Sequence, residues 1–423
     1  MKNCWFIGKN MKRKTGKFFL LFVLASLAFP GCFSSWKGDE ATITLLLGNT
    51  DGGGQRTIAS DDEILSYLVH IIELDGPTGR QSHTVKSDKP FSVTVMPGYW
   101  HISVRALLNT TLYAQGENGA EIKAGKNNQV KIDMKPLIKD NLIFVTNNLD
   151  YYSDLTNMPD APIPGSLRYA LKDIPLDEGN ITIMVILPRG SEIKLKSNLY
   201  FNANTNITIE GNGIILSKSD EWDDSVDYKR LMNIWSGQKN DAEVTIRRVH
   251  FKDSEGGAIE NWVTLNLESC IFSNNNSPNG GAIQNIREGI LSVKGCTFYG
   301  NSADDSGGTI YNENGVIEKL TGNLFSNNKA KYWPVIENSA VAGGGVSSCY
   351  YNAVDVELGI DENKSGWKPG LGDKSFATGI QLIDKNFKPV PALNSIVPKD
   401  LIDFPTTDFY GNKRTSGAPG AVN

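Results

Sequence analysis

The sequence has 423 residues, of which 21% are charged and 42 are glycine, a composition typical of β-rich chains with many turns. This length exceeds one ordinary domain, so two or three are expected. Residues 1–31 contain six basic residues and no acidic one, so the chain from residue 32 has 36 basic and 47 acidic residues, a formal charge of −11. That balance argues against a nucleic-acid partner, because binding to phosphate needs a basic surface.

Residues 1–31 are predicted to be an export signal. A basic cluster at 11–14 precedes an apolar run of thirteen residues at 18–30, which is too short to span a bilayer but suits a signal peptide. Whether Met1 or Met11 starts the chain stays open. The run ends in Leu-Ala-Phe-Pro-Gly-Cys, which resembles the lipobox of bacterial lipoproteins and implies cleavage before Cys32 and acylation of that residue.

The predicted lipid at Cys32 would attach the protein to a membrane without a transmembrane helix. Phe29 and Pro30 depart from the usual lipobox, so a plain secretory signal that happens to contain Cys32 is the alternative. We expect an outer-membrane lipoprotein exposed at the cell surface, and a periplasmic orientation stays open. Residues 32–40 are predicted to be a short polar tether to the lipid anchor.

Residues 41–136 alternate apolar and polar side chains at strand period, for example at Phe91, Val93 and Val95. About seven short strands in this length fit a β-sandwich of prealbumin-like or Ig-like type. The stretch 96–102, with its Pro-Gly turn, resembles prealbumin-like modules in which two strands and this turn form one edge. A fold alone carries no function, so a spacer is preferred over a carbohydrate- or protein-binding module.

Residues 141–423 are predicted to form a right-handed parallel β-helix. Its start, Gly-Ser-Leu-Arg-Tyr-Ala-Leu at 165–171, resembles the segment that opens extracellular β-helix domains, which implies a short helix that caps the first coil. Ser166 is a plausible N-cap. Four apolar residues have the spacing of one helix face: Leu167, Ala170, Leu171 and Ile174. An acidic and aromatic insertion at 219–241 interrupts the pattern that follows.

One pattern recurs five times between Val244 and Val354, at steps of 21, 26, 27 and 26 residues. An aromatic residue anchors each copy: Phe251, Phe272, Phe298, Phe325 and Tyr351. Two positions earlier stand Val249, Cys270, Cys296, Asn323 and Cys349, and upstream Ile214 is expected to take the anchor position. A period of this length indicates stacked units that bury one continuous core.

Asparagine and glycine recur at the expected bends. Asparagines follow the middle anchors by three residues, at Asn275, Asn301 and Asn328, and others close the next segment, at Asn261, Asn285, Asn312 and Asn338. Stacked asparagines can hydrogen-bond along their column and tolerate left-handed backbone. Gly-Gly pairs at 256–257, 280–281 and 307–308 permit turns in which a Cβ would clash.

The segments GGAI, GGAI and GGTI, in register with three FxxN motifs, resemble the repeats of the polymorphic membrane protein family. The resemblance covers about 110 residues and implies a right-handed parallel β-helix. Residues 407–418 look like the closing segment of such domains. Longer family members continue into a membrane barrel, and no further alternating strands precede Asn423, so we expect Cys32 to replace that anchor.

The cysteines of the repeat are expected to share one column as small buried hydrophobes. Adjacent coils lie about 4.8 Å apart, which permits a Cys270–Cys296 disulfide in distance but rarely in torsion. No Cys or His spacing suggests a metal site, and no cofactor is expected.

No catalytic constellation emerges from the repeat. Glu260 and Glu337 share a column three coils apart, about 14 Å at the stacking distance, whereas paired glycosidase carboxylates need about 5–9.5 Å. Arg247, Glu268 and Lys294 are predicted to form exposed ion pairs of little energetic weight. His250 is expected to face solvent.

The candidate ligand patch lies in and near the insertion, at Trp222, Trp235, Trp262, Asp223 and Asp224. Tryptophan suits stacking on a sugar or docking of a protein, although a core-covering loop would use it too. The acids of the insertion do not match the ligand spacing of an EF-hand. We therefore predict a monomeric, non-enzymatic adhesin that binds a glycan or an extracellular matrix protein. The alternatives are a polysaccharide-active enzyme working through the insertion, and a structural envelope spacer.

Overall fold

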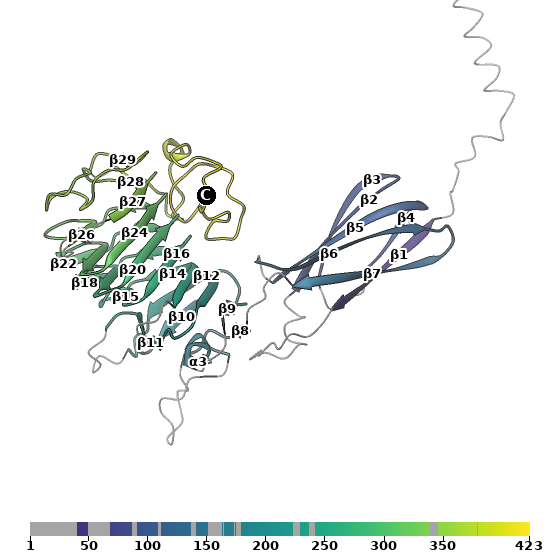
Figure 1. Ribbon diagram of the computed structural model, residues 1–423, viewed down its shortest axis with the longest axis horizontal. Coiled ribbons are helices and arrows are strands. Elements are labelled where there is room, and N and C mark those ends of the chain that lie inside the picture. The colour runs from purple at the N-terminus through teal and green to yellow at the C-terminus, as the bar shows by residue number, and fades with distance from the viewer. Residues whose placement is uncertain are drawn as a thin grey trace, which may run out of the picture.

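The computed structural model describes most of the chain beyond the N-terminal 39 residues. The described residues are 40–49, 68–86, 91–108, 111–136, 141–150, 163, 165–172, 174, 179–222, 229–236, 242–338, 346–378 and 380–423. The predicted signal peptide, tether and Cys32 lie outside them. Within these residues the regular structure is almost wholly β, and no helix has the length and apolar character to cross a membrane (Figure 1).

Seven strands form the N-terminal sandwich. They are β1 (Ala41–Asn49), β2 (Leu68–Gly76), β3 (Gly79–Lys86), β4 (Ser92–Val95), β5 (Gly98–Leu108), β6 (Thr111–Ile122) and β7 (Asn127–Pro136). One layer has the order β3-β2-β5-β6 and the other β7-β1-β4, joined by a short β6–β7 contact. Alternating side chains such as Ile72, Trp100 and Ile102 fill the space between the layers and are fully buried.

The sequence resemblance implied that the strands on either side of the Pro-Gly turn form one edge, but the two strands lie in different layers. β4 pairs with β1, whereas β5 pairs with β2 and β6, so the chain crosses from one layer to the other at Met96 and Pro97. The sandwich core also continues into the next region. Outward side chains of the first β-helix strands, including Phe144 and Met184, belong to the same buried cluster as the sandwich core.

The second region is a parallel β-helix in which each turn of the chain adds one strand, or two short consecutive strands, to the largest sheet (Figure 1). The largest sheet contains β8 (Asn141–Val145), β9 (Ile181–Val185), β10 (Glu192–Leu195), β12 (Ile207–Lys218), β14 (Glu243–Lys252), β16 (Thr264–Glu268), β17 (Ile271–Ser273), β20 (Ile290–Lys294), β21 (Thr297–Tyr299), β24 (Val316–Thr321), β25 (Leu324–Ser326), β27 (Val346–Tyr350), β28 (Ala353–Val354) and β29 (Lys374–Ser375). The next sheet contains β11 (Leu199–Asn202), β13 (Met232–Trp235), β15 (Ile259–Asn261), β19 (Ile283–Ile286), β23 (Ile310–Glu313) and β26 (Ile336–Asn338). A small sheet pairs β18 (Asn276–Asn279) with β22 (Ser302–Ser306).

The predicted aromatic column is present in the interior. Phe251, Phe272, Phe298 and Phe325 stack in near-parallel planes with ring centroids 4.8–4.9 Å apart. All four are fully buried. Trp367 closes the column against Phe325, with a centroid distance of 5.4 Å. The inward side chains therefore form one continuous core, which confirms the right-handed β-helix prediction.

The asparagine columns form hydrogen-bonded ladders at the bends. Asn261 donates through Nδ2 to Oδ1 of Asn285 at 2.7 Å, and Asn285 donates in the same way to Asn312 at 2.6 Å. Glycine is required beside them, because a Cβ on Gly281 would lie 2.3 Å from the carbonyl oxygen of Gly308. The sequence therefore determines the bends as well as the interior.

The predicted register is wrong at both ends of the array. A bulge in β12 places Leu216, not Ile214, beside Phe251. In the last coil Val354, not Tyr351, pairs with Phe325, so Cys349 lies beside Leu320 and not in the column of Cys270 and Cys296. The thiols of Cys270, Cys296 and Cys349 are free. A bulge and a three-residue offset are invisible to a count from one aromatic residue to the next.

The predicted capping helix is α3 (Leu167–Lys172). Ser166 accepts a hydrogen bond at Oγ from the amide of Tyr169, which confirms it as the N-cap. Arg168 turns inward and forms a bidentate pair with Asp150, at 2.6 and 2.9 Å. This pair anchors the cap to the chain that enters the first coil.

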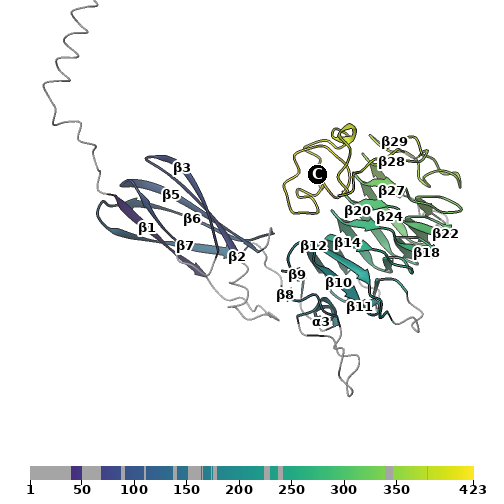
Figure 2. The same cartoon turned by 180° about the vertical axis from the view of Figure 1, so that it is seen from behind.

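Residues 355–423, here called the C-terminal segment, contain little regular structure, namely β29 and the 3-10 turn η1 (Pro391–Leu393). In Figures 1 and 2 the yellow part of this segment lies along the outer face of the largest sheet. Phe409 and Val422 pack on Ile271 of β17. Arg414 is half-buried and donates to the backbone carbonyls of Gly295 and Gly420 at 3.3 and 2.8 Å.

Candidate functional sites

Three half-exposed or exposed aromatic side chains lie on successive coils along the sheet that contains β11, β13 and β15. Tyr200, on β11, is 53% exposed and stacks on Trp235 of β13, with centroids 5.7 Å apart and planes 26° apart. Trp262 follows on the next coil, where its amide donates to the carbonyl of Ile234. The guanidinium of Arg287, one coil further on, lies 4.2 Å from the Trp262 ring centroid. We call Tyr200, Trp235, Trp262 and Arg287 the aromatic surface.

The predicted ligand patch is divided by the structure. Trp235 and Trp262 belong to the aromatic surface, but Trp222 is only 7% exposed and lies in the main core cluster of the β-helix. Trp222 therefore helps to cover the core and does not offer a free ring to a ligand. Asp223 and Asp224 lie outside the described residues.

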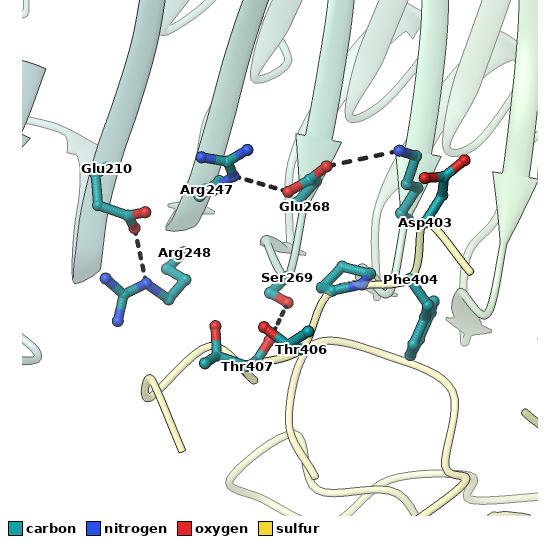
Figure 3. A pocket seen from close by; sticks show the side chains of 11 residues that line it. Glu210, Arg247, Arg248, Glu268, Ser269, Asp403, Phe404, Thr406 and Thr407 are labelled. Atoms are coloured by element: carbon teal, nitrogen blue, oxygen red, sulfur yellow. Dashed lines mark hydrogen bonds and ion pairs between the residues drawn. The ribbon is translucent and has the colours of Figure 1, made fainter. Parts of the chain in front are cut away.

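A charged cavity of about 380 Å³ lies between the largest sheet and the C-terminal segment (Figure 3). Its floor is Arg247, Glu268 and Lys294 on adjacent strands, with Glu210 and Arg248 beside them, and residues 403–407 cover it. Arg247 Nε donates to Glu268 at 2.7 Å, and Lys294 lies 3.6 Å from the other oxygen of the same carboxylate. The predicted ion pairs are thus confirmed, but they line a cavity and not an open face.

Arg248 and Glu210 form a second, buried ion pair in this cavity. Their side chains are 5% and 10% exposed, and Nε of Arg248 donates to Oε1 of Glu210 at 2.7 Å. Arg248 has a left-handed backbone with φ of 55°, which interrupts the alternation of side chains along the strand, so that Arg247 and Arg248 both line the cavity. The sequence alone does not show which of the two adjacent arginines is buried.

His250 does not face solvent, contrary to the prediction. It is 6% exposed and its ring packs edge-on against Phe387 and Phe409 of the C-terminal segment, at 5.1 and 6.3 Å. Burial lowers the pKa of His250 to about 4, with a smaller contribution from Lys252. The repeat pattern correctly placed this side chain outward but could not show that a distant segment covers it.

Two arginines hold backbone in ways that the sequence pattern did not reveal, namely Arg230, which is buried, and Arg414, which is half-buried. Arg230 donates to the backbone carbonyls of Gly280 and Asn279, at 2.9 and 2.6 Å, and burial lowers its pKa to about 10. Burial also lowers the pKa of Arg414 to about 10. Each arginine thus binds backbone carbonyls at a strand end or in a turn, Arg230 at the end of β18 and Arg414 between β20 and β21.

Within the described residues, no group of three or more His, Cys, Asp or Glu side chains is placed so that it could hold a metal ion. Glu260 and Glu337 occupy one outward column three strand steps apart, through Gln284 and Tyr311. They are therefore too far apart to act as a catalytic pair.

The fold defines a right-handed parallel β-helix protein with a β-sandwich at its N-terminal side. The family model of the Chlamydia polymorphic membrane protein repeat matches residues 295–313. This stretch contains the Phe298–Asn301 pair and the segment 307–310, whose side chains serve the core and bends. The match thus concerns one repeat unit of the scaffold.

Among solved structures, the chain is similar to jun a 1, the major allergen from cedar pollen. The two are 14% identical, the alignment covers 58% of this chain and 82% of that chain, and the TM-score is 0.18. A likeness this weak supports no functional argument. The comparison with curated proteins gives no match.

Proposed function

We propose that this chain is a lipid-anchored protein of the bacterial cell envelope that displays its β-helix at the cell surface and binds a protein of the surrounding matrix. The aromatic surface is the observation that carries the proposal. Tyrosine, tryptophan and arginine are the residues most enriched at energetically dominant positions of protein interfaces. Tyr200 and Trp235 sit on stacked strands, so little conformational entropy is lost when a partner covers them.

The proposal includes acylation at Cys32 and a non-enzymatic role. Export and attachment are supported by the apolar run and Cys32 in the sequence, and the envelope by the repeat match. A non-enzymatic role is supported by the state of the cavity carboxylates. Glu210 and Glu268 are each bound to an arginine, whereas a general acid or base must be free to exchange its proton with substrate.

Binding of the full chain to immobilised matrix proteins tests the proposal. We expect saturable binding that Tyr200→Ala and Trp262→Ala each weaken by at least tenfold, while Tyr350→Ala, which alters another exposed tyrosine, leaves it unchanged. Turnover of acidic or neutral polysaccharide that is lost in the Asp223→Ala/Asp224→Ala double variant would instead establish the enzyme alternative.

The anchor and the orientation need separate experiments. Acyl labelling should disappear in Cys32→Ala, and labelling that persists would refute lipidation at this residue. Protease treatment of intact cells should cleave the protein. Complete protection would place it on the inner side of the membrane, where adhesion is excluded.

A further inference from the structure

The asparagine ladder that follows the aromatic column has a repeating geometry. In each step the backbone amide and Nδ2 of one asparagine both donate to Oδ1 of the asparagine in the next coil. Asn275 donates to Asn301 at 3.1 and 2.9 Å, and Asn301 donates to Asn328 at 3.0 Å through both groups. Every step therefore presents a pair of donors that converge on one oxygen atom.

This ladder ends at Asn328 without such an oxygen. Nδ2 of Asn328 donates to the carbonyl of Phe298 at 3.0 Å, as in earlier coils, but its amide has no hydrogen-bond partner in the described part of the chain. The next coil leaves the register after Val354, which pairs with Phe325. Asp355 then turns its carboxylate back to accept from the amide of Asn327 at 2.6 Å.

A neighbouring ladder shows what completes such an end. Asn323 donates to Asn352, and Asn352 donates through its amide and Nδ2 to Oδ1 of Asp373, at 2.8 and 2.9 Å. The last donor pair thus receives an oxygen from a side chain outside the ladder. Asn328 offers the same donor pair but faces a cavity in place of such a side chain.

The cavity at Asn328 has a volume of about 470 Å³ and lies between the last coils and the C-terminal segment. Asn328 is 8% exposed, whereas Asn275 and Asn301 are fully buried, as expected for a residue in a cavity wall. Asp355 and the side chain of Gln381 add polar groups. Apolar wall is provided by Tyr299, Ala330, Pro334, Val356 and Ile380. We call this space the ladder-end cavity.

We propose that the ladder-end cavity binds a neutral saccharide. One sugar oxygen accepts from the donor pair of Asn328, in the role that Asp373 plays in the neighbouring ladder. An adjacent hydroxyl donates to the carboxylate of Asp355, and the C–H face of the ring packs on the apolar wall. A hydroxyl group both donates and accepts, so adjacent hydroxyls match an amide pair beside a carboxylate.

Size and charge support this class of ligand. The volume falls within the range of about 300–1,000 Å³ that is usual for small-molecule sites. An acidic sugar would bring a second carboxylate next to Asp355, where repulsion and burial oppose it. The inference goes beyond adhesion through the aromatic surface and does not depend on it, because the two sites share no residue.

Titration calorimetry of the full chain with methyl glycosides of neutral hexoses, and with the corresponding uronic acids, tests the proposal. We expect at least one neutral glycoside to bind at least tenfold more tightly than its uronic acid. Ala330→Trp, which fills the cavity, should abolish binding. Asp355→Asn, which keeps an acceptor for the amide of Asn327 but removes the charge, should weaken binding at least tenfold.

The control is Trp262→Ala, which should leave saccharide binding unchanged and so separates this site from the aromatic surface. If no neutral glycoside binds at millimolar concentration to the folded protein, the proposal is overturned. Unchanged binding in Asp355→Asn, or tighter binding of the uronic acids, would overturn it equally, and neither depends on whether Ala330→Trp folds.

Discussion

The repeat array between Val244 and Val354 and the C-terminal segment at 355–423 both bury side chains against other parts of the protein, but through different kinds of contact. In the array each buried side chain has an equivalent one coil away, so the Phe298 ring stacks on like rings and Asn301 bonds to like amides. In the C-terminal segment the contacts are individual and do not repeat. Arg414 donates hydrogen bonds to several backbone carbonyls, and the amide of Ala421 donates to Thr297 Oγ1 at 2.8 Å.

This difference explains where cavities occur. A coil in register satisfies the donors and the apolar face of the coil before it, so it leaves little unfilled. An irregular segment meets the same surface without matching its period. The charged cavity and the ladder-end cavity both lie between the coils and the C-terminal segment.

The array should be most sensitive at its aromatic column. Phe298→Ala removes a fully buried ring from the middle of four and should lower the free energy of unfolding by about 3–5 kcal/mol. Urea unfolding measures this. Phe404→Ala, at a half-buried position of the C-terminal segment, is the comparison and should cost less than half as much. Equal losses would show that the regular column is no more tightly coupled than the irregular segment.

Two neighbouring arginines at the boundary between the array and the C-terminal segment should contribute differently to stability. Arg248→Met leaves Glu210 buried without this partner and should cost about 3–4 kcal/mol in the free energy of unfolding. Arg247→Met removes an ion pair whose arginine side chain is 42% exposed and should cost less than about 1 kcal/mol. Similar costs would mean that the C-terminal segment does not exclude water from this cavity.

His250 reports whether the C-terminal segment stays closed over the outer face. Its pKa is lowered to about 4 by burial, so the unfolded chain binds the proton first as pH falls from 6.5 to 4. Stability should drop through that window by on the order of 3 kcal/mol, and little above it. His250→Gln should remove this part of the pH dependence, while His101→Gln, at an exposed position, should not. Parallel curves for wild type and His250→Gln would show that the ring is accessible to water.

The smallest expected effect concerns the cysteine column. Cys270 and Cys296 are both fully buried, and burial also raises the pKa of Cys296. Thiol reagents should therefore modify neither residue in the folded protein at neutral pH and should modify both in denaturant. Cys296→Ala should cost about 1 kcal/mol. Peptide mass spectrometry measures the labelling, and rapid labelling of the native protein would indicate that the coils separate locally.

The repeat made the interior of this protein predictable. Columns of Phe, Asn and Gly at one period reveal which side chains face inward and where the chain bends, because each coil repeats the packing problem of its neighbour. The capping helix was equally readable from Ser166 and its apolar spacing. The register at the ends of the array could not be predicted, because the bulge in β12 and the departure of the chain from the coil at Asp355 change the spacing between equivalent residues.

The sequence by itself therefore determined the all-β architecture, the aromatic column and the ladders, all of which depend on contacts between equivalent positions. Only the tertiary structure decided that His250 and Arg248 are buried, that Trp222 belongs to the core, and that Asn328 ends its ladder at a cavity. Each of these depends on contacts between the coils and irregular chain, such as the C-terminal segment, which has no period. Contacts between non-equivalent, distant residues leave no pattern in a single sequence, and in this protein they shape both cavities.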